Sequence, residues 1–171
     1  VSGSWVTSAV DSVADVGEYS SIAVGTSGAV YISYYDDTNG DLKYATNVSG
    51  SWVTSAVDSV ADVGEYSSIA VGTSGAVHIS YCDDTNGDLK YATNVSGSWV
   101  TSAVDSVAEV GKYSSIGVGI SGVVHISYCD DTNGDLKYAT NVSGSWVISV
   151  VDSVAEVGKY SSIDVGTSGA V

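Results

Sequence analysis

The chain has 171 residues, 44% of them hydrophobic, which is enough for one domain with a packed core. Its formal charge of −15, with five lysines and no arginine, excludes the basic surface that nucleic-acid binding requires and argues against an anionic membrane surface. No apolar run reaches 18 residues, so we expect no membrane insertion.

A repeat of 47 residues organises the chain, because tryptophan recurs at that interval from Trp5 to Trp146. The sequence therefore predicts a single repeat domain, residues 1–171, built from internal copies of one unit. The copies are residues 1–47, 48–94, 95–141 and a truncated 142–171.

Each copy alternates apolar and polar residues between short turns rich in Gly, Asn and Ser, which is typical of antiparallel β-sheet. Nothing in this alternation indicates a helix. In the first copy we expect strands at residues 5–10, 19–24, 30–35 and 41–46, with a long connection at 11–18 and turns at 25–28 and 47–50.

The dipeptide Asn39-Gly40 separates the last two of these strands. It predicts a two-residue type I′ hairpin turn, because both central residues of that turn need φ > 0.

The fold class that follows is all-β: a β-propeller whose blades are these 47-residue, four-stranded antiparallel repeats. The small, apolar strand at 19–24 fits the innermost position of a blade, and the strand that begins at Trp52 fits the outer edge. The chain then starts with an outer strand at 5–10 and ends with an inner strand at 160–165. Because its ends do not fall on blade boundaries, we expect a homo-oligomer or a longer array to complete the ring.

Charge is expected on one face only, because alternate loops of an antiparallel blade lie at opposite ends. Of the 20 acidic residues, 19 fall at the end that holds the long connection and the hairpin, and only Asp164 does not. All five lysines lie beside the same end, whereas the turns at 25–28 and 47–50 carry no charge.

The hairpin also resembles half of an oxygen-rich Ca²⁺ loop, since it carries an Asp-x-Asn-x-Asp pattern. Against this, the distal Glu of such loops is missing, and Asp and Asn favour turns without any metal. Calcium therefore stays an alternative to a turn. Its ligands would be Asp37, Asn39 and Asp41, with Asp84, Asn86, Asp88, Asp131, Asn133 and Asp135 in the later copies.

Three further residue types admit a structural reading. His78 and His125 stand where the first copy has Tyr31, without a second metal ligand at suitable spacing, so we expect packed or rim aromatics. Cys82 and Cys129 replace Tyr35 and are expected to be free thiols. The Asn-Val-Ser triplets that begin at Asn47, Asn94 and Asn141 are either glycosylation acceptors or turns.

Aromatic residues near turns are candidates for stacking on sugar rings. Trp52 is more readily explained by packing between blades, given the area that an indole buries. The tyrosines that follow the long acidic connection are better placed for a ligand. The candidates are Tyr19, Tyr66, Tyr113 and Tyr160, together with Tyr35 and Tyr44.

Residues 30–52 read V-Y-I-S-Y-Y-D-D-T-N-G-D-L-K-Y-A-T-N-V-S-G-S-W. This segment resembles blades of the fucose-specific-lectin and sialidase-like propeller superfamilies, and it is similar to bacterial extracellular repeats of the HISYYD…GDLKYA kind. The resemblance implies a propeller and glycan binding. No fucose-site residue carries over, because the lectins' Arg and acid are absent from residues 31–33 and 43–44. With no arginine for a substrate carboxylate, sialidase activity should also be absent.

Catalysis has little support in the sequence, because near-identical copies do not give two carboxylates the different environments that glycoside hydrolysis needs. We therefore expect a non-enzymatic, secreted or cell-surface protein that binds glycans weakly at each blade and gains avidity from copy number. The alternatives are an adhesive scaffold without a small ligand, and a Ca²⁺ binder.

Overall fold

The computed structural model describes residues 4–171 and contains twelve β-strands. The described part of the chain holds no helix that is long and apolar enough to cross a lipid bilayer. The strands are β1 (Val16–Val24), β2 (Val30–Asp36), β3 (Asp41–Thr46), β4 (Val53–Asp58), β5 (Val63–Val71), β6 (Val77–Asp83), β7 (Asp88–Thr93), β8 (Val100–Asp105), β9 (Val110–Val118), β10 (Val124–Asp130), β11 (Asp135–Thr140) and β12 (Val147–Asp152).

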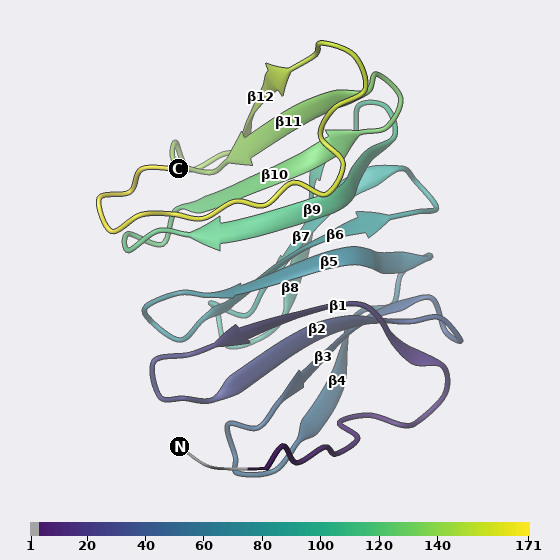
Figure 1. Cartoon of the computed structure of the whole chain (residues 1–171), viewed down its shortest axis with the longest axis vertical. Coiled ribbons are helices and arrows are strands. Elements are labelled where there is room, and N and C mark those ends of the chain that lie inside the picture. Colours follow the sequence, from purple (N-terminus) through teal and green to yellow (C-terminus); the bar gives the residue numbers. More distant parts are fainter. Residues whose placement is uncertain (1–3) are drawn as a thin grey trace.

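The strands form three separate four-stranded antiparallel sheets, each in simple up-and-down order. We call β1–β4 the first blade, β5–β8 the second and β9–β12 the third. Inner strand β5 contacts both β1 and β9, so the sheets are arranged like blades around a common axis. The first and third blades lie at opposite ends of this open stack (Figure 1). The predicted propeller fold and the assignment of inner and outer strands are confirmed, with the ring left open.

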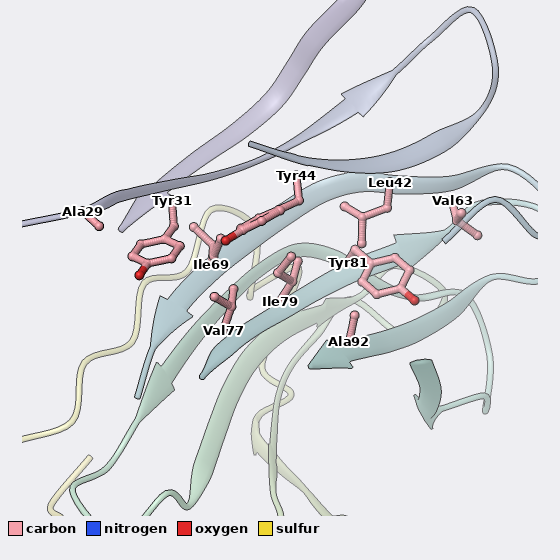
Figure 2. Packing of buried hydrophobic residues seen from close by; sticks show 10 residues of the cluster. All are labelled: Ala29, Tyr31, Leu42, Tyr44, Val63, Ile69, Val77, Ile79, Tyr81 and Ala92. Carbon is pink, nitrogen blue, oxygen red and sulfur yellow. The ribbon is translucent and has the colours of Figure 1, made fainter. Parts of the chain in front are cut away.

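The main hydrophobic clusters lie between blades, because each sheet has apolar side chains that its neighbour covers. Between the first and second blades, Leu42 and Tyr44 of β3 face Val63 and Ile79 (Figure 2). Leu42, Val63 and Ile79 are completely buried there.

Glycine allows the blades to approach closely. A Cβ atom on Gly64 would lie only 2.7 Å from the Cα atom of Leu42, and Gly111 faces Leu89 in the same way at 2.8 Å. Both glycines have a positive φ, which adds a second reason for the residue type.

Tryptophan completes each blade interface. Trp99 of the second blade packs edge-on against Tyr44 of the first, with ring centroids 5.2 Å apart, and Trp146 packs on Tyr91 in the same way. These two tryptophans therefore lie between blades.

The prediction of a type I′ turn at Asn39-Gly40 is wrong. Asp36 pairs with Asp41, which leaves a four-residue loop, and only Gly40 in this loop has a positive φ. The Asp36 carboxylate accepts hydrogen bonds from the backbone N–H of Asn39 at 3.1 Å and from its side-chain amide at 3.0 Å. These bonds hold the loop in a wider turn, since Asp competes for nearby backbone donors.

The two terminal strands that the sequence predicts are also wrong. Residues 5–10 and 160–165 are extended but belong to none of the three sheets. The physical reason is that each would need neighbouring strands of its own blade, and the described residues provide none. The C-terminal segment nevertheless lies against the stack, since the Ile163 N–H donates to the Ser115 hydroxyl, whereas Trp5 and Val6 of the N-terminal segment are exposed.

Candidate functional site

Four tyrosines from neighbouring repeats meet where the inner strands converge. The register between β1 and β2 shifts between Glu18 and Ser21, so Tyr19 lies in a β-bulge outside the regular ladder. Tyr19 has a φ of 48°, and its three counterparts have values of 51° to 58°. Bulges and positive φ values at non-glycine residues are concentrated at functional sites, where they redirect a side chain.

We call these residues, Tyr19, Tyr66, Tyr113 and Tyr160, the tyrosine arc. Successive ring centroids are 4.5, 4.6 and 4.4 Å apart, and the rings are tilted by 45° to 58°. The Ser67 hydroxyl donates to the Tyr19 carbonyl at 3.0 Å, and the Ser114 hydroxyl donates to the Tyr66 carbonyl at 3.1 Å. Hydrogen bonds between blades thus fix the spacing of the arc.

The arc lines an open depression of about 220 Å³, which it shares with the serine that follows each tyrosine. Aromatic faces and hydroxyl groups therefore alternate along one surface. Burial and the neighbouring hydroxyl of Tyr19 raise the pKa of Tyr66, so its phenol remains a neutral donor at physiological pH.

Charge beside the arc changes sign along the stack. Glu18 and Glu65 precede the first two tyrosines, whereas Lys112 and Lys159 precede the last two. Both lysines approach the same carboxylate, that of Asp131, at 3.9 and 3.7 Å. Burial and the nearby Asp84 raise the pKa of Glu65.

The other two candidate tyrosines do not join the arc. Tyr35 is buried and donates its hydroxyl to Asp62 at 2.6 Å, while Tyr44 is buried against Trp99. Both residues therefore hold neighbouring blades together and are not accessible to a sugar ring.

The hairpin residues that we considered as Ca²⁺ ligands are arranged as a turn. Asp37 and Asn39 are exposed, and the Asn39 amide nitrogen points at both oxygens of Asp36. The Asn86 amide nitrogen also points at both oxygens of Asp83, and that of Asn133 points at one oxygen of Asp130. Asp84 and Asp131 are exposed, while Asp41, Asp88 and Asp135 pair across the hairpin with the preceding strand. Within residues 4–171 there is no group of three or more His, Cys, Asp or Glu side chains that could hold a metal ion.

The histidines and cysteines are interior residues. His78 is buried, stacks on Tyr91 and shares a 2.6 Å hydrogen bond with its hydroxyl, and His125 pairs with Tyr138 in the same way. Burial lowers the pKa of both imidazoles. Cys82 and Cys129 are buried free thiols, as predicted, and burial raises the pKa of Cys82 to about 12.

The Asn-Val-Ser triplets form turns that use the asparagine side chain. The Asn47 amide oxygen accepts from the Val30 N–H at 2.8 Å, and Asn94 and Asn141 accept from Val77 and Val124 at the same distance. Each asparagine thus fastens the turn to the start of a strand in its own blade.

Sequence reasoning missed a buried charge cluster in every blade. Asp58 lies at the end of β4 and accepts from Lys90 at 2.6 Å and from the Tyr81 hydroxyl at 2.7 Å. Lys90 also lies 3.7 Å from Asp83. The equivalent clusters are Asp11 with Lys43, Tyr34 and Asp36, and Asp105 with Lys137, Tyr128 and Asp130.

These contacts determine how the cluster carboxylates ionise. The Lys43 ammonium and the Tyr34 hydroxyl lower the pKa of Asp11 to about 2. Burial would raise the pKa of Asp58 and Asp105, but the bonds from lysine and tyrosine outweigh it, so both pKa values are lowered. The signal in the sequence was the constant spacing of these residues in every repeat.

Comparison with known proteins supports the fold. No family model and no curated protein matches the sequence. One similar solved structure is an α-L-arabinofuranosidase from Fusarium graminearum in complex with an iminosugar inhibitor, with 14% identity and a TM-score of 0.52, which covers 84% of this chain and 50% of that one. Another belongs to the GH130 family of mannoside phosphorylases, which contains glycoside hydrolases that target β-1,2 mannosidic linkages in Candida mannan. It has 17% identity and a TM-score of 0.50, and the alignment covers 90% of this chain and 50% of that one.

The chain thus spans half the length of each of these propeller neighbours. The prediction that the protein is not an enzyme needs correction, because both neighbours are described as enzymes of glycoside chemistry. At these identities the likeness establishes a β-propeller fold.

Proposed function

We propose that the protein binds carbohydrate at the tyrosine arc. The observation that carries this proposal is the bulge-held row of four tilted aromatic rings beside a row of serine hydroxyls. Sugar rings present apolar C–H faces to an aromatic ring and hydroxyl groups to polar neighbours, so both surfaces of the depression have a partner.

Two further observations support this function. The solved structures with this fold act on arabinofuranosides and on β-1,2-mannosides, according to their descriptions. The lectin and bacterial extracellular repeats that the chain resembles support a weak, multivalent mode of binding at a cell surface. Because the arc repeats a single tyrosine position, several sugar units of one chain can be bound in a row.

The test uses arabino-oligosaccharides and β-1,2-linked manno-oligosaccharides, followed by a wider set of immobilised neutral glycans. We expect ligand-observed NMR to show binding that Tyr113→Ala weakens about 10-fold, the factor that loss of an aromatic contact gives. Trp5→Ala is the control, because Trp5 is an aromatic residue outside the arc and is 99% exposed. Release of reducing sugar is followed in the same samples.

Two results would contradict the proposal. One is the absence of binding to every neutral glycan at high protein density. The other is binding that Tyr113→Ala leaves unchanged.

A further inference from the structure

The two outer faces of the three-blade stack are complementary halves of one interface. That interface occurs twice inside the chain, between the first and second blades and between the second and third. In the first case the Val63 N–H donates to the Gly40 carbonyl at 3.1 Å, and the Ser67 and Ser33 hydroxyls lie 2.9 Å apart. The second case repeats both contacts through Val110 and Ser114.

Among the residues that the structure describes, no blade covers the half of this interface that the first blade presents. Ile22 of β1 is 64% exposed, whereas its counterparts Ile69 and Ile116 are each 6% exposed. Gly17 has no atom within 4 Å of its Cβ direction, although Gly64 and Gly111 each receive a leucine there. A hollow of about 150 Å³ lies at this place, and Val16, Ile32 and Tyr34 contribute to its lining.

The third blade presents the other half. Within residues 4–171, Tyr138 has no tryptophan against it, whereas Tyr44 and Tyr91 each have one. Trp52 of the first blade has no tyrosine against it in the same range. The Tyr138 ring at one end of the stack and the Trp52 ring at the other therefore each lack the aromatic partner that the other could provide.

The C-terminal segment covers part of this second face as a substitute for an inner strand. Val157 donates to the Gly134 carbonyl at 2.8 Å, Ser161 lies 2.9 Å from Ser127, and the Ile163 N–H donates to Ser115 at 3.1 Å. These are the contacts that β5 and β9 make with the blade before them. Unlike those strands, the segment is followed by no further strand of its own blade within residues 4–171.

The N-terminal segment covers the first blade in a related way, because Asp11 occupies the cluster position that Asp58 and Asp105 occupy elsewhere. Residues 1–30 and 142–171 are aligned copies that are identical at 25 of 30 positions. Either terminal segment can therefore be replaced, contact for contact, by the equivalent residues of another chain.

We propose that two copies of residues 1–171 join head to tail, with β1 of each copy displacing the C-terminal segment from the third blade of the other. Asp152 then takes the place of Asp11 beside Lys43 and Tyr34, and Trp52 packs on Tyr138. Two copies of three blades close a six-bladed ring, whereas three copies would give nine blades, outside the usual range of four to eight. A pair also matches the length of the propeller neighbours, of which one chain spans half.

This assembly follows from the blade interfaces and does not depend on carbohydrate binding. It does change the candidate site, because the open arc becomes a closed ring of six tyrosines, Tyr19, Tyr66 and Tyr113 from each copy. The site is therefore incomplete in one chain.

The test is the mass in solution, by light scattering and by native mass spectrometry. We expect about 35 kDa for a purified chain of residues 1–171, twice the 17.3 kDa of one copy. The decisive variants are Ile22→Asp and Ile163→Asp, which change the same repeat position in the two competing segments. Ile22→Asp should give a monomer, because Ile22 is buried only in the pair. Ile163→Asp should leave the pair intact, because it weakens only the segment that is displaced.

Ile120→Asp is a control at a turn residue whose side chain is 63% exposed and whose backbone carbonyl, which the substitution keeps, accepts from Thr73 of the second blade. A monomer for the unmodified protein over the micromolar range would overturn the proposal, and so would a ladder of larger oligomers. A pair that survives Ile22→Asp but is lost with Ile163→Asp would show that the C-terminal segment itself makes the contact, and would overturn the exchange. Circular dichroism of each variant separates loss of pairing from loss of fold.

Discussion

At the scale of single residues, the buried clusters of aspartate, lysine and tyrosine are the main electrostatic feature of the fold. Asp105 and Lys137 have side chains that are 2% and 9% exposed, so each charge depends on the other. A buried ion pair adds little over an apolar pair, but removal of one member leaves an uncompensated charge. Asp58 and Asp105 also join two blades each, since they end the outer strand of one blade and bind the next.

Asp105→Asn should therefore lower the free energy of unfolding by about 3–5 kcal/mol at pH 7, the cost of leaving a buried partner unpaired. Urea denaturation measures the change. Asp84→Asn is the control, because Asp84 is an exposed hairpin residue, and its substitution should cost less than about 0.5 kcal/mol. An equal decrease in the free energy of unfolding for the two variants would contradict a stabilising role of the cluster.

The same clusters should make stability fall in acid. A carboxylate whose pKa is lowered by folding stabilises the protein above its unfolded pKa of about 3.9, and this stabilisation is lost as pH falls through the folded value. For Asp11 that loss extends from about pH 4 to about pH 2, because its folded pKa is about 2. The difference in unfolding free energy between the unmodified protein and Asp105→Asn should narrow below pH 4. A difference that is constant down to pH 2 would exclude this linkage.

At the scale of elements, the hairpin loop shows what local sequence patterns can and cannot predict. Apolar alternation correctly predicted the strands that flank Asn39-Gly40. A two-residue loop would have paired Thr38 with Asp41, whereas the wider loop pairs Asp36 with Asp41 and so sets Tyr34 opposite Lys43. The choice depends on the Asp36 carboxylate, whose bonds to Asn39 stabilise the wider loop, and alternation carries no information on those bonds.

We expect the loop to gain nothing from calcium, because the Asn39 amide already occupies the Asp36 oxygens and Lys43 stands 3.6 Å from one of them. Millimolar Ca²⁺, enough for weak extracellular sites, should leave the melting temperature unchanged. Differential scanning calorimetry with Ca²⁺ and then with a chelator measures this temperature. A rise in melting temperature that the chelator reverses would support a Ca²⁺ site in the loop.

The other features that the sequence did not predict also depend on contacts between segments that are distant in sequence. The terminal segments have the same sequence pattern as the observed strands, yet they form none. A strand needs a hydrogen-bonded neighbouring strand, and apolar alternation does not show whether one is present. The sequence singled out Tyr19 as a candidate for binding, but the bulge that holds it depends on a register shift that only the paired strands reveal. The acidic residues were expected at one end of the blades, but alternation does not show that several of them are buried, where hydrogen bonds from lysine and tyrosine compensate their charge.

At the scale of the whole molecule, stability comes from the surfaces between blades. Each blade alone is a four-stranded sheet with apolar faces, and the fold becomes stable when a neighbour covers them. This is the arrangement of repeat proteins, in which each unit contacts only the units beside it. It explains the spacing of Trp99 and Trp146 by the repeat length, since each of these two covers a tyrosine of the blade before it.

Trp99→Ala should accordingly lower the free energy of unfolding by about 2–3 kcal/mol, less than a fully buried tryptophan because the indole is only partly covered. Trp5→Ala changes the same repeat position where the side chain is 99% exposed, and it should have almost no effect. Thermal and urea unfolding followed by tryptophan fluorescence compare the two. A similar cost at both positions would mean that the contact with Tyr44 contributes nothing.

The near identity of the repeats has a consequence for how the chain reaches its native state. An unfolded chain contains three almost interchangeable inner strands, so β9 can dock where β5 belongs and enclose the second unit in a loop. Such misassembly is the characteristic failure of repeat proteins, and synthesis from the N-terminus reduces it because early units fold before later copies emerge. Refolding from denaturant should therefore be slower and more heterogeneous than folding on the ribosome, and the Glu65 and Lys112 positions provide one of the few chemical differences that distinguish correct neighbours from incorrect ones.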